Sequence, residues 1–175
     1  MMFIAKNNGK IILAKGTEDE LLQGLKLMNY DVIEETTENY ILYNGQYLTE
    51  TEVLPEIKVQ KQEENTRLAK FAVENGHVVF KNAEFETNAQ TVGDLTATML
   101  LMQAGGIETY SWLSKDDQAV ELTTEDFGTL GALIAEYKNT IWQEKYIAYK
   151  TAIEQAETVE AVNAIVINYT AEPSN

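Results

Sequence analysis

The sequence contains no cysteine, only two prolines and a single histidine, and these absences exclude several classes of function. Without cysteine the chain can form neither a disulfide framework nor a thiolate metal site, which is typical of a cytosolic protein. No apolar run approaches the roughly 18 residues that a membrane-spanning helix needs. The N-terminal stretch is interrupted by Asn7, Asn8 and Gly9 before a signal-peptide core could form, so we expect no export by that route.

Basic residues are also scarce, and the charge is strongly one-sided. The 175 residues include 28 acids and 13 bases, which gives a formal net charge of -15. Nucleic-acid binding draws its affinity from clustered Lys and Arg, so we predict neither a nucleic-acid partner nor a membrane partner. The acids are scattered over expected helix starts and turns, where they favour solubility. A DNA-mimicking inhibitor is the less favoured reading of the same charge pattern.

The first 54 residues predict a small body of hairpins and one helix. Asn8-Gly9 and Asn44-Gly45 are pairs that tight two-residue turns favour, and short apolar strands flank each of them. Between the hairpins, Thr17 and Glu20 have the spacing of a capping box, which predicts a helix from there to about Asn29.

The pattern is helical from Thr49 to Gly76, and within it residues 55–75 are the predicted polar connecting helix, with Pro55 suited to its first turn and Asn75-Gly76 to its end. Its middle, residues 58–67, is almost wholly polar, so we expect these turns to face solvent on every side. The predicted domains are therefore 1–54, 55–75 and 76–175. The alternative is a surface helix on a single domain.

The region from His77 onward repeats the order hairpin, helix, hairpin, helix. Thr17 and Thr91 are separated by the same number of residues as Thr49 and Thr123, and several apolar positions align at that offset. This pattern raises the hypothesis of a duplicated module, in which both halves share one strand order.

A long helix is expected from Thr124 to about Gln155. Its apolar positions first follow a heptad seam, and after Ile141 they move to another face. A coiled-coil trimer would need the seam to continue, so we favour packing within the chain, with a final helix near residues 159–166 on the second face. The seam consists of Phe127, Leu130, Ile134, Tyr137 and Ile141, and the second face of Trp142, Tyr146, Tyr149 and Ile153.

No group of residues has a catalytic spacing. His77 stands at an expected element boundary without a visible partner, and no serine lies in a nucleophile elbow. Asp116-Asp117 reads as a turn and Gly105-Gly106 as a helix stop. We therefore predict no catalytic, cofactor-binding or metal-binding residues. Among so many acids some carboxylate pair will lie close in space, so a hydrolase with such a pair stays a third alternative.

Aromatic residues at alternating strand positions are the candidates for protein contact. Half of such positions face outward if a sheet has one solvent-exposed face, and exposed Tyr and Trp side chains favour contact with other proteins. The alternative is that they cover the helices from within. The candidates are Tyr40, Tyr43, Tyr47, Tyr110 and Trp112.

From His77 to Ile167 the chain resembles the uncharacterised C-terminal domain of phage and prophage tail-associated proteins, which include tail fibre and fibre-assembly proteins. The resemblance rests on the Trp112 strand, the Asp116-Asp117 turn, "VELTTEDF" and "AIEQAETVEAV". It implies a non-enzymatic structural or assembly protein that binds other tail or baseplate proteins. It implies a place in the bacterial cytoplasm during assembly or in the virion tail, and it brings no catalytic residues. The chain departs from many relatives in lacking arginine near the tryptophan.

Together these patterns predict an α+β protein in which short antiparallel hairpins pack with helices, in two similar small bodies joined by a polar helix. The alternative function is an acidic interaction module that inhibits a host factor. The oligomeric state stays open between a monomer and a small homo-oligomer.

Overall fold

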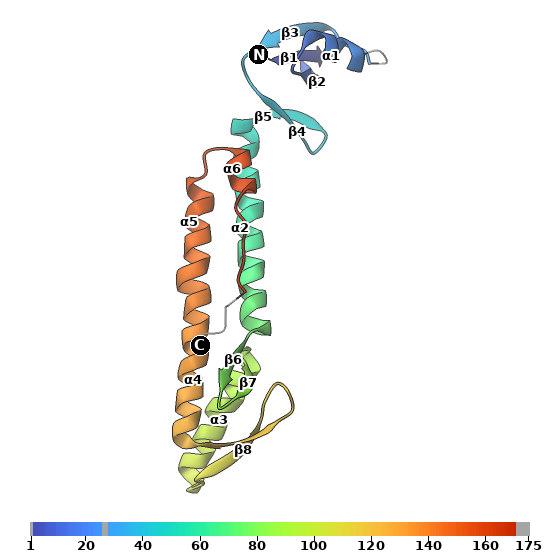
Figure 1. The fold of residues 1–175 in the computed structure, drawn as a ribbon. Helices are drawn as coiled ribbons and strands as arrows, with labels where there is room; N and C mark the ends of the chain where they lie inside the picture. The colour runs from blue at the N-terminus through green and yellow to red at the C-terminus, as the bar shows by residue number, and fades with distance from the viewer. Residues whose placement is uncertain (1, 26–27, 171–175) are drawn as a thin grey trace. The chain divides into compact units, whose positions relative to one another are not determined.

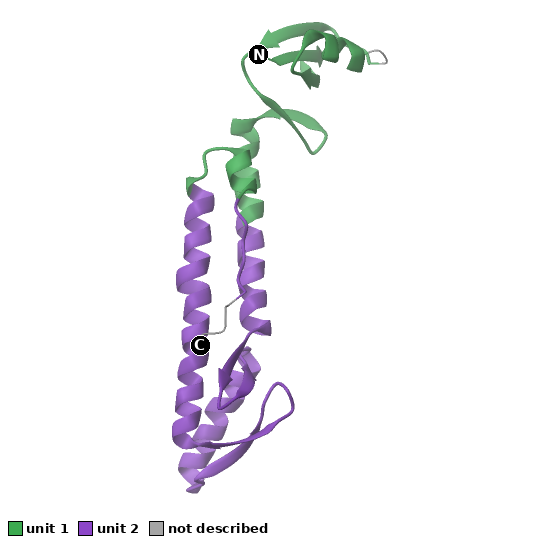
Figure 2. Ribbon diagram, viewed as in Figure 1, with its two compact units in different colours: residues 1–61, 155–164 green, residues 62–154, 165–175 purple. Residues whose placement is uncertain are grey.

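The computed structural model describes residues 2–25 and 28–170, which combine helices with antiparallel strand hairpins (Figure 1). This confirms the predicted α+β class. The chain forms two compact units (Figure 2), one of Met1–Lys61 with Gln155–Ala164 and the other of Gln62–Glu154 with Ile165–Asn175. The boundary after Lys61 therefore falls inside a helix.

Unit 1 begins with a three-stranded sheet, in which the strand order is β2-β1-β3. The predicted first turn is confirmed, because Asn8 and Gly9 adopt φ angles of 50° and 76°. The second turn is confirmed in the same way at Asn44 and Gly45, with φ angles of 49° and 80°. The elements of unit 1 are β1 (Met2–Asn7), β2 (Lys10–Lys15), α1 (Glu18–Gly24), β3 (Val32–Thr36), β4 (Tyr40–Tyr43), β5 (Gln46–Thr49), the start of α2 (Glu50–Asn75) and α6 (Val159–Asn163).

Helix α1 begins as predicted and ends earlier than predicted. The Thr17 hydroxyl accepts a hydrogen bond from the Glu20 backbone N–H at 3.2 Å. The helix ends at Gly24, whereas the prediction carried it to Asn29, which is not helical; residues 26 and 27 lie outside the described part. A Cβ on Gly24 would lie 2.6 Å from Leu13, so this glycine lets the end of α1 approach β2 closely.

Helix α2 begins at Glu50, five residues before Pro55, so the prediction of Pro55 in the first turn is wrong. The earlier start has a local cause at Thr49. Its backbone N–H and its hydroxyl both donate to the Glu52 carboxylate at 2.8 Å, which satisfies groups ahead of the helix.

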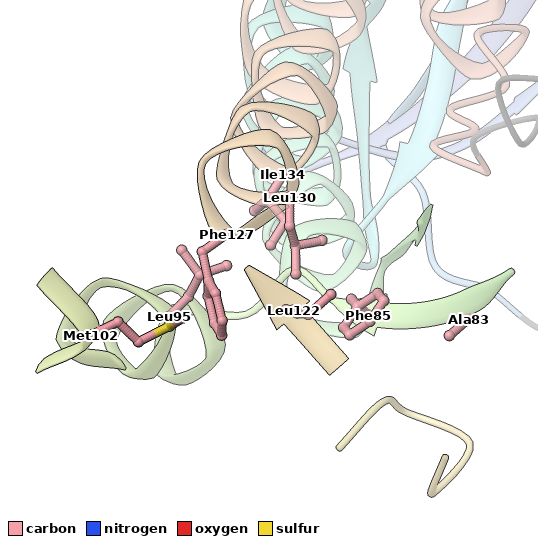
Figure 3. Packing of buried hydrophobic residues seen from close by; sticks show 8 residues of the cluster. All are labelled: Ala83, Phe85, Leu95, Met102, Leu122, Phe127, Leu130 and Ile134. Atoms are coloured by element: carbon pink, nitrogen blue, oxygen red, sulfur yellow. The ribbon is translucent and has the colours of Figure 1, made fainter. Parts of the chain in front are cut away.

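Unit 2 contains the largest hydrophobic core. Two hairpins and two helices surround the buried ring of Phe127, with Leu95 and Met102 on α3 and Leu130 and Ile134 on α4 (Figure 3). Burial of these side chains is the main stabilising contribution in this part of the chain. The elements are β6 (His77–Phe80), β7 (Ala83–Glu86), α3 (Ala89–Gly105), β8 (Thr109–Leu113), β9 (Ala119–Thr123), α4 (Thr124–Asn139), η1 (Thr140–Tyr146) and α5 (Ile147–Gln155).

The two halves both alternate hairpins with helices, but they differ in their sheets and β3 has no counterpart in the second half. In the first half β3 pairs with β1, so that the hairpin becomes a three-stranded sheet. In the second half β6 and β7 form a two-stranded sheet. A copied module would keep one strand order, so the halves do not satisfy the duplication hypothesis.

The polar middle of α2 is not surrounded by solvent, which corrects the prediction. Asn65 is fully buried within unit 2. Its amide nitrogen donates to the Tyr146 carbonyl at 3.3 Å, and its amide oxygen accepts from the Tyr169 hydroxyl. A buried amide is tolerated because both of its ends are bonded. Burial raises the pKa of Tyr169 to about 12.

A π-helix, η1, explains why the apolar face of the long helix changes. The wider turn inserts one extra residue, so that Trp142 and Tyr146 pack against the same cluster as Ile141, whereas Glu144 is exposed. The predicted span from Thr124 to Gln155 is confirmed as α4, η1 and α5 in succession. The seam residues Phe127, Leu130, Ile134 and Ile141 are buried within their own chain, as the intramolecular alternative required.

Candidate protein-binding site

A groove of about 320 Å³ lies between α3 and α4 in unit 2. Both helices present residues spaced three and four apart, so a single face of each helix forms a wall. Most of the lining residues are apolar or are glycines. On α3 it consists of Val92, Leu95, Thr96 and Met99, and on α4 of Phe127, Gly128, Gly131, Ile134, Ala135 and Lys138.

Both helices begin at side-chain caps that fix their start. The Asn88 side chain accepts from the Thr91 backbone N–H at 2.8 Å at the start of α3. At the start of α4, Thr123 and Asp126 form a complete capping box. Helix α3 ends where Gly106 takes a left-handed conformation with φ of 62°, which confirms the predicted stop.

The carboxylate of Asp126 is held ionised by its partners. It accepts from the Lys81 ammonium group at 2.5 Å and from the Thr123 backbone N–H at 2.8 Å. These bonds, with that of Lys81 the larger influence, lower the pKa of Asp126 to about 2. The start of α4 is thus tied to the turn between β6 and β7.

Phe127 forms part of the groove and connects it to the tryptophan hairpin. The rings of Trp112 and Phe127 meet edge to face, with centroids 5.3 Å apart and an interplanar angle of 75°. Such an arrangement is favourable beyond simple burial of area. Trp112 is half-buried and packs against the core that contains Phe127.

Two exposed leucines follow the groove lining along α3, and one of them lies on the groove side of the helix. Leu100 and Leu101 expose 57% and 54% of their surface. Leu100 follows Thr96 by four residues, so it lies on the side of α3 that continues the groove wall. Leu101, nine residues after Val92, lies on the opposite side of α3 from the groove.

The five aromatic residues predicted as contacts are spread over both units. In unit 1, Tyr47 packs against the core, Tyr40 donates to Glu38 at 2.8 Å, and the Tyr43 hydroxyl accepts from Gln60 at 2.6 Å. In unit 2, Tyr110 is exposed and Trp112 is half-buried. None of the five lines the groove, and their role in contacts stays a prediction.

The signals that mark the groove were present in the sequence. Gly128 and Gly131 interrupt a strongly helical segment, and Leu100-Leu101 continues an apolar run that one face of α3 cannot bury entirely. Without the packing of α3 against α4, neither signal indicates a groove.

The polar groups elsewhere in unit 2 form short local networks. His77 lies 3.7 Å from Glu84, which also lies 3.6 Å from Lys115. The Asp116 carboxylate accepts from the Ser114 hydroxyl at 2.6 Å, and this bond is the main cause of its lowered pKa. Over residues 2–25 and 28–170, no three His, Asp or Glu side chains gather as metal ligands would.

The fold defines the chain as an α+β protein of two compact units, with an apolar groove in the second. Residues 56–167 match a domain of unknown function, DUF4376. Since this match spans more than half of the chain, the protein belongs to the DUF4376 family. No curated protein and no solved structure matches the chain significantly. Among the described helices, none combines the length and the apolar character needed to cross a membrane.

Proposed function

We propose that this protein is a non-enzymatic structural or assembly protein of phage or prophage tails, and that it acts by binding other tail or baseplate proteins. The observation that carries the binding role is the apolar surface of α3 and α4. The groove is mostly apolar, and the exposed Leu100 lies one helical turn after Thr96 of its lining, on a strongly acidic chain. The link to tails rests on the resemblance of residues 77–167, which includes Trp112 and its hairpin.

The first test of the tail assignment is the sequence of the DNA that flanks the gene in its source strain. Baseplate, tape-measure or fibre genes on either side are the expected result. They would also supply candidate partners for direct binding measurements. A metabolic or defence operon around the gene would contradict the assignment.

The net charge of -15 favours one second candidate, an acidic module that inhibits a host factor. Such a module would bind a basic protein mainly through exposed charges. Its affinity would fall steeply between low and physiological salt, because exposed charges are screened within about 10 Å at 0.1 M salt. Binding that instead depends on the apolar groove would favour the tail protein.

A further inference from the structure

Two helix-interior glycines, Gly128 and Gly131, lie in the α4 wall of the groove and add no side chain to it. A Cβ on Gly128 would meet no atom within 4 Å, and one on Gly131 would make an ordinary contact with Leu95 at 3.6 Å. Glycine inside a helix costs roughly 0.5–1 kcal/mol relative to alanine. Packing within unit 2 gives no reason for this cost at Gly128. The close approach of another backbone would explain a glycine at this position, because only glycine places no side chain on the helix surface.

The wall on α3 is extended by one exposed side chain, Leu100, that a second helix would bury. Leu100 continues the wall one turn past Thr96, whereas the exposed row of Ala97, Leu101 and Ala104 lies on the far side of α3. A helix that binds in a groove inserts apolar anchors at the same spacing of three and four residues. The surface of α3 therefore fits an amphipathic helix better than an extended strand.

The charge around the groove selects the kind of helix. The two helices that form the groove carry four acids, Asp94, Glu125, Asp126 and Glu136, and one basic residue, Lys138, and α3 itself carries no Lys or Arg. Lys138 lies at one end of the lining. A basic helix is attracted to this surface, whereas a second copy of the chain would bring another net charge of -15 against it.

We propose that the groove between α3 and α4 binds an amphipathic helix of another protein. The apolar face of this helix packs over Gly128 and against Leu100, and its polar face carries Lys and Arg. The inference rests on the proposed function in that it assigns the site and the chemistry of the partner. The proposed binding does not depend on the identity of the phage or on a catalytic group.

The test uses the full chain and two synthetic helical peptides. One peptide carries Leu and Ala on one face and Lys on the other, and its matched control carries Glu in place of Lys. The protein variants are Gly128→Met, which fills the groove, and Thr129→Met, which adds the same side chain to α4 outside the groove lining. Thermal unfolding by circular dichroism establishes that both variants are folded.

We expect the Lys peptide to bind the unmodified chain and the Thr129→Met chain with similar affinity. Gly128→Met is expected to weaken binding by about tenfold or more, since it removes the contact area of an apolar anchor. The Glu peptide is expected to bind about tenfold more weakly than the Lys peptide because of charge repulsion. Fluorescence of Trp112 in a Trp142→Phe background reports occupancy, because its ring touches Phe127 of the groove.

Three results would overturn the inference. The first is equal binding of the Lys peptide to the Gly128→Met and Thr129→Met chains, which would show attraction to surface charge alone. The second is equal binding of the two peptides. The third is self-association, seen by light scattering, that Gly128→Met abolishes, since a second copy would then occupy the groove.

The failure of this inference can be told apart from the failure of the proposed function. If tail proteins co-purify equally with the unmodified and the Gly128→Met chains, the groove is not their site while the tail function stands. If the Lys peptide fills the groove but no tail protein co-purifies with the unmodified chain, the binding inference stands and the tail function fails.

Discussion

The packing of unit 2 requires a residue without a side chain at Gly76. A Cβ there would lie 2.3 Å from the Tyr137 hydroxyl and 2.6 Å from the Ala72 carbonyl oxygen. The Tyr137 hydroxyl also donates to that carbonyl at 3.0 Å, so neither neighbour can move without losing a bond. We expect Gly76→Ala to destabilise the protein by about 1–3 kcal/mol, as overpacking usually does.

Urea unfolding measures this change, and Gly93→Ala is its matched control. Gly93 also lies in unit 2, inside α3, where a Cβ would meet no atom within 4 Å. That substitution is expected to stabilise the helix by roughly 0.5–1 kcal/mol. A Gly76→Ala chain as stable as the unmodified one would show that Tyr137 does not occupy the described position.

Asp126 makes stability depend on pH in a defined range. Its pKa of about 2 in the folded chain lies below the value near 3.9 that is usual for an unfolded aspartate. Because the folded-state pKa is depressed, the ionised carboxylate stabilises the fold at any pH above the pKa of the unfolded chain. This contribution is lost as the pH falls towards 2. We expect Asp126→Asn to lower the unfolding midpoint at pH 6 and to change it little at pH 2.

Unfolding midpoints measured from pH 2 to pH 6 test this expectation. Asp94→Asn is the control, since it removes a carboxylate of α3 that accepts from Gln90 and makes no bond to Lys81. A difference between Asp126→Asn and the unmodified chain that stayed constant over this pH range would contradict the role assigned to Lys81.

The Tyr169 hydroxyl connects the C-terminal segment of unit 2 to α2 by a hydrogen bond to Asn65. In Tyr169→Phe the buried Asn65 oxygen loses its partner, so we expect a loss of about 1–3 kcal/mol, the usual cost of an unsatisfied buried polar group. Tyr149→Phe is the control, because its bonds to Asn168 are exposed and water can replace them. Equal losses in the two variants, measured by thermal unfolding, would contradict the burial of this contact.

At the scale of elements, the π-helix η1 corrects the register between two apolar faces. Removing one residue from η1 should convert it to an α-helix and leave Tyr146 and the residues after it on the same face. We therefore expect deletion of Gln143 to be tolerated. Deletion of Glu136 from α4 is expected to unfold or strongly destabilise unit 2, since it rotates Tyr137 and Ile141 away from the core.

Circular dichroism and thermal unfolding of the two deletion variants distinguish these outcomes. Both deletions shorten the same long helix by one residue, so chain length does not explain a difference between them. If deletion of Gln143 were as damaging as deletion of Glu136, the π-helix would not be the cause of the shifted face.

Local signals were sufficient to predict most turns and helix starts. Asn8-Gly9 and Asn44-Gly45 adopt the positive φ angles that their residue types favour, and Thr123 caps α4 as its spacing with Asp126 predicts. The polar middle of α2 was predicted wrongly because the partners of Asn65 lie 81 and 104 residues away. No local pattern carries that information.

The groove was missed for a related reason. In the sequence, Gly128 only interrupts a helical pattern and Leu100-Leu101 only continues an apolar run. Their meaning depends on which faces of α3 and α4 meet. The change of face after Ile141 was visible in the sequence, although its cause, an inserted residue in η1, became visible only with the helix geometry.

At the scale of the whole molecule, the matched DUF4376 region, residues 56–167, contains the groove, the tryptophan hairpin and the long helix. The proposed binding site therefore lies in the part that defines the family. The net charge of -15 lies on the same chain and supports the proposal of a basic partner.

The central claim is that this protein binds tail proteins, and co-purification from the source strain tests it most directly. A tagged full chain is isolated from cells in which phage assembly is under way, beside a tagged Gly128→Met chain, and mass spectrometry identifies the bound proteins. We expect fibre or baseplate proteins with the unmodified chain and a marked loss of them with Gly128→Met. The absence of any tail protein from both samples would contradict the account.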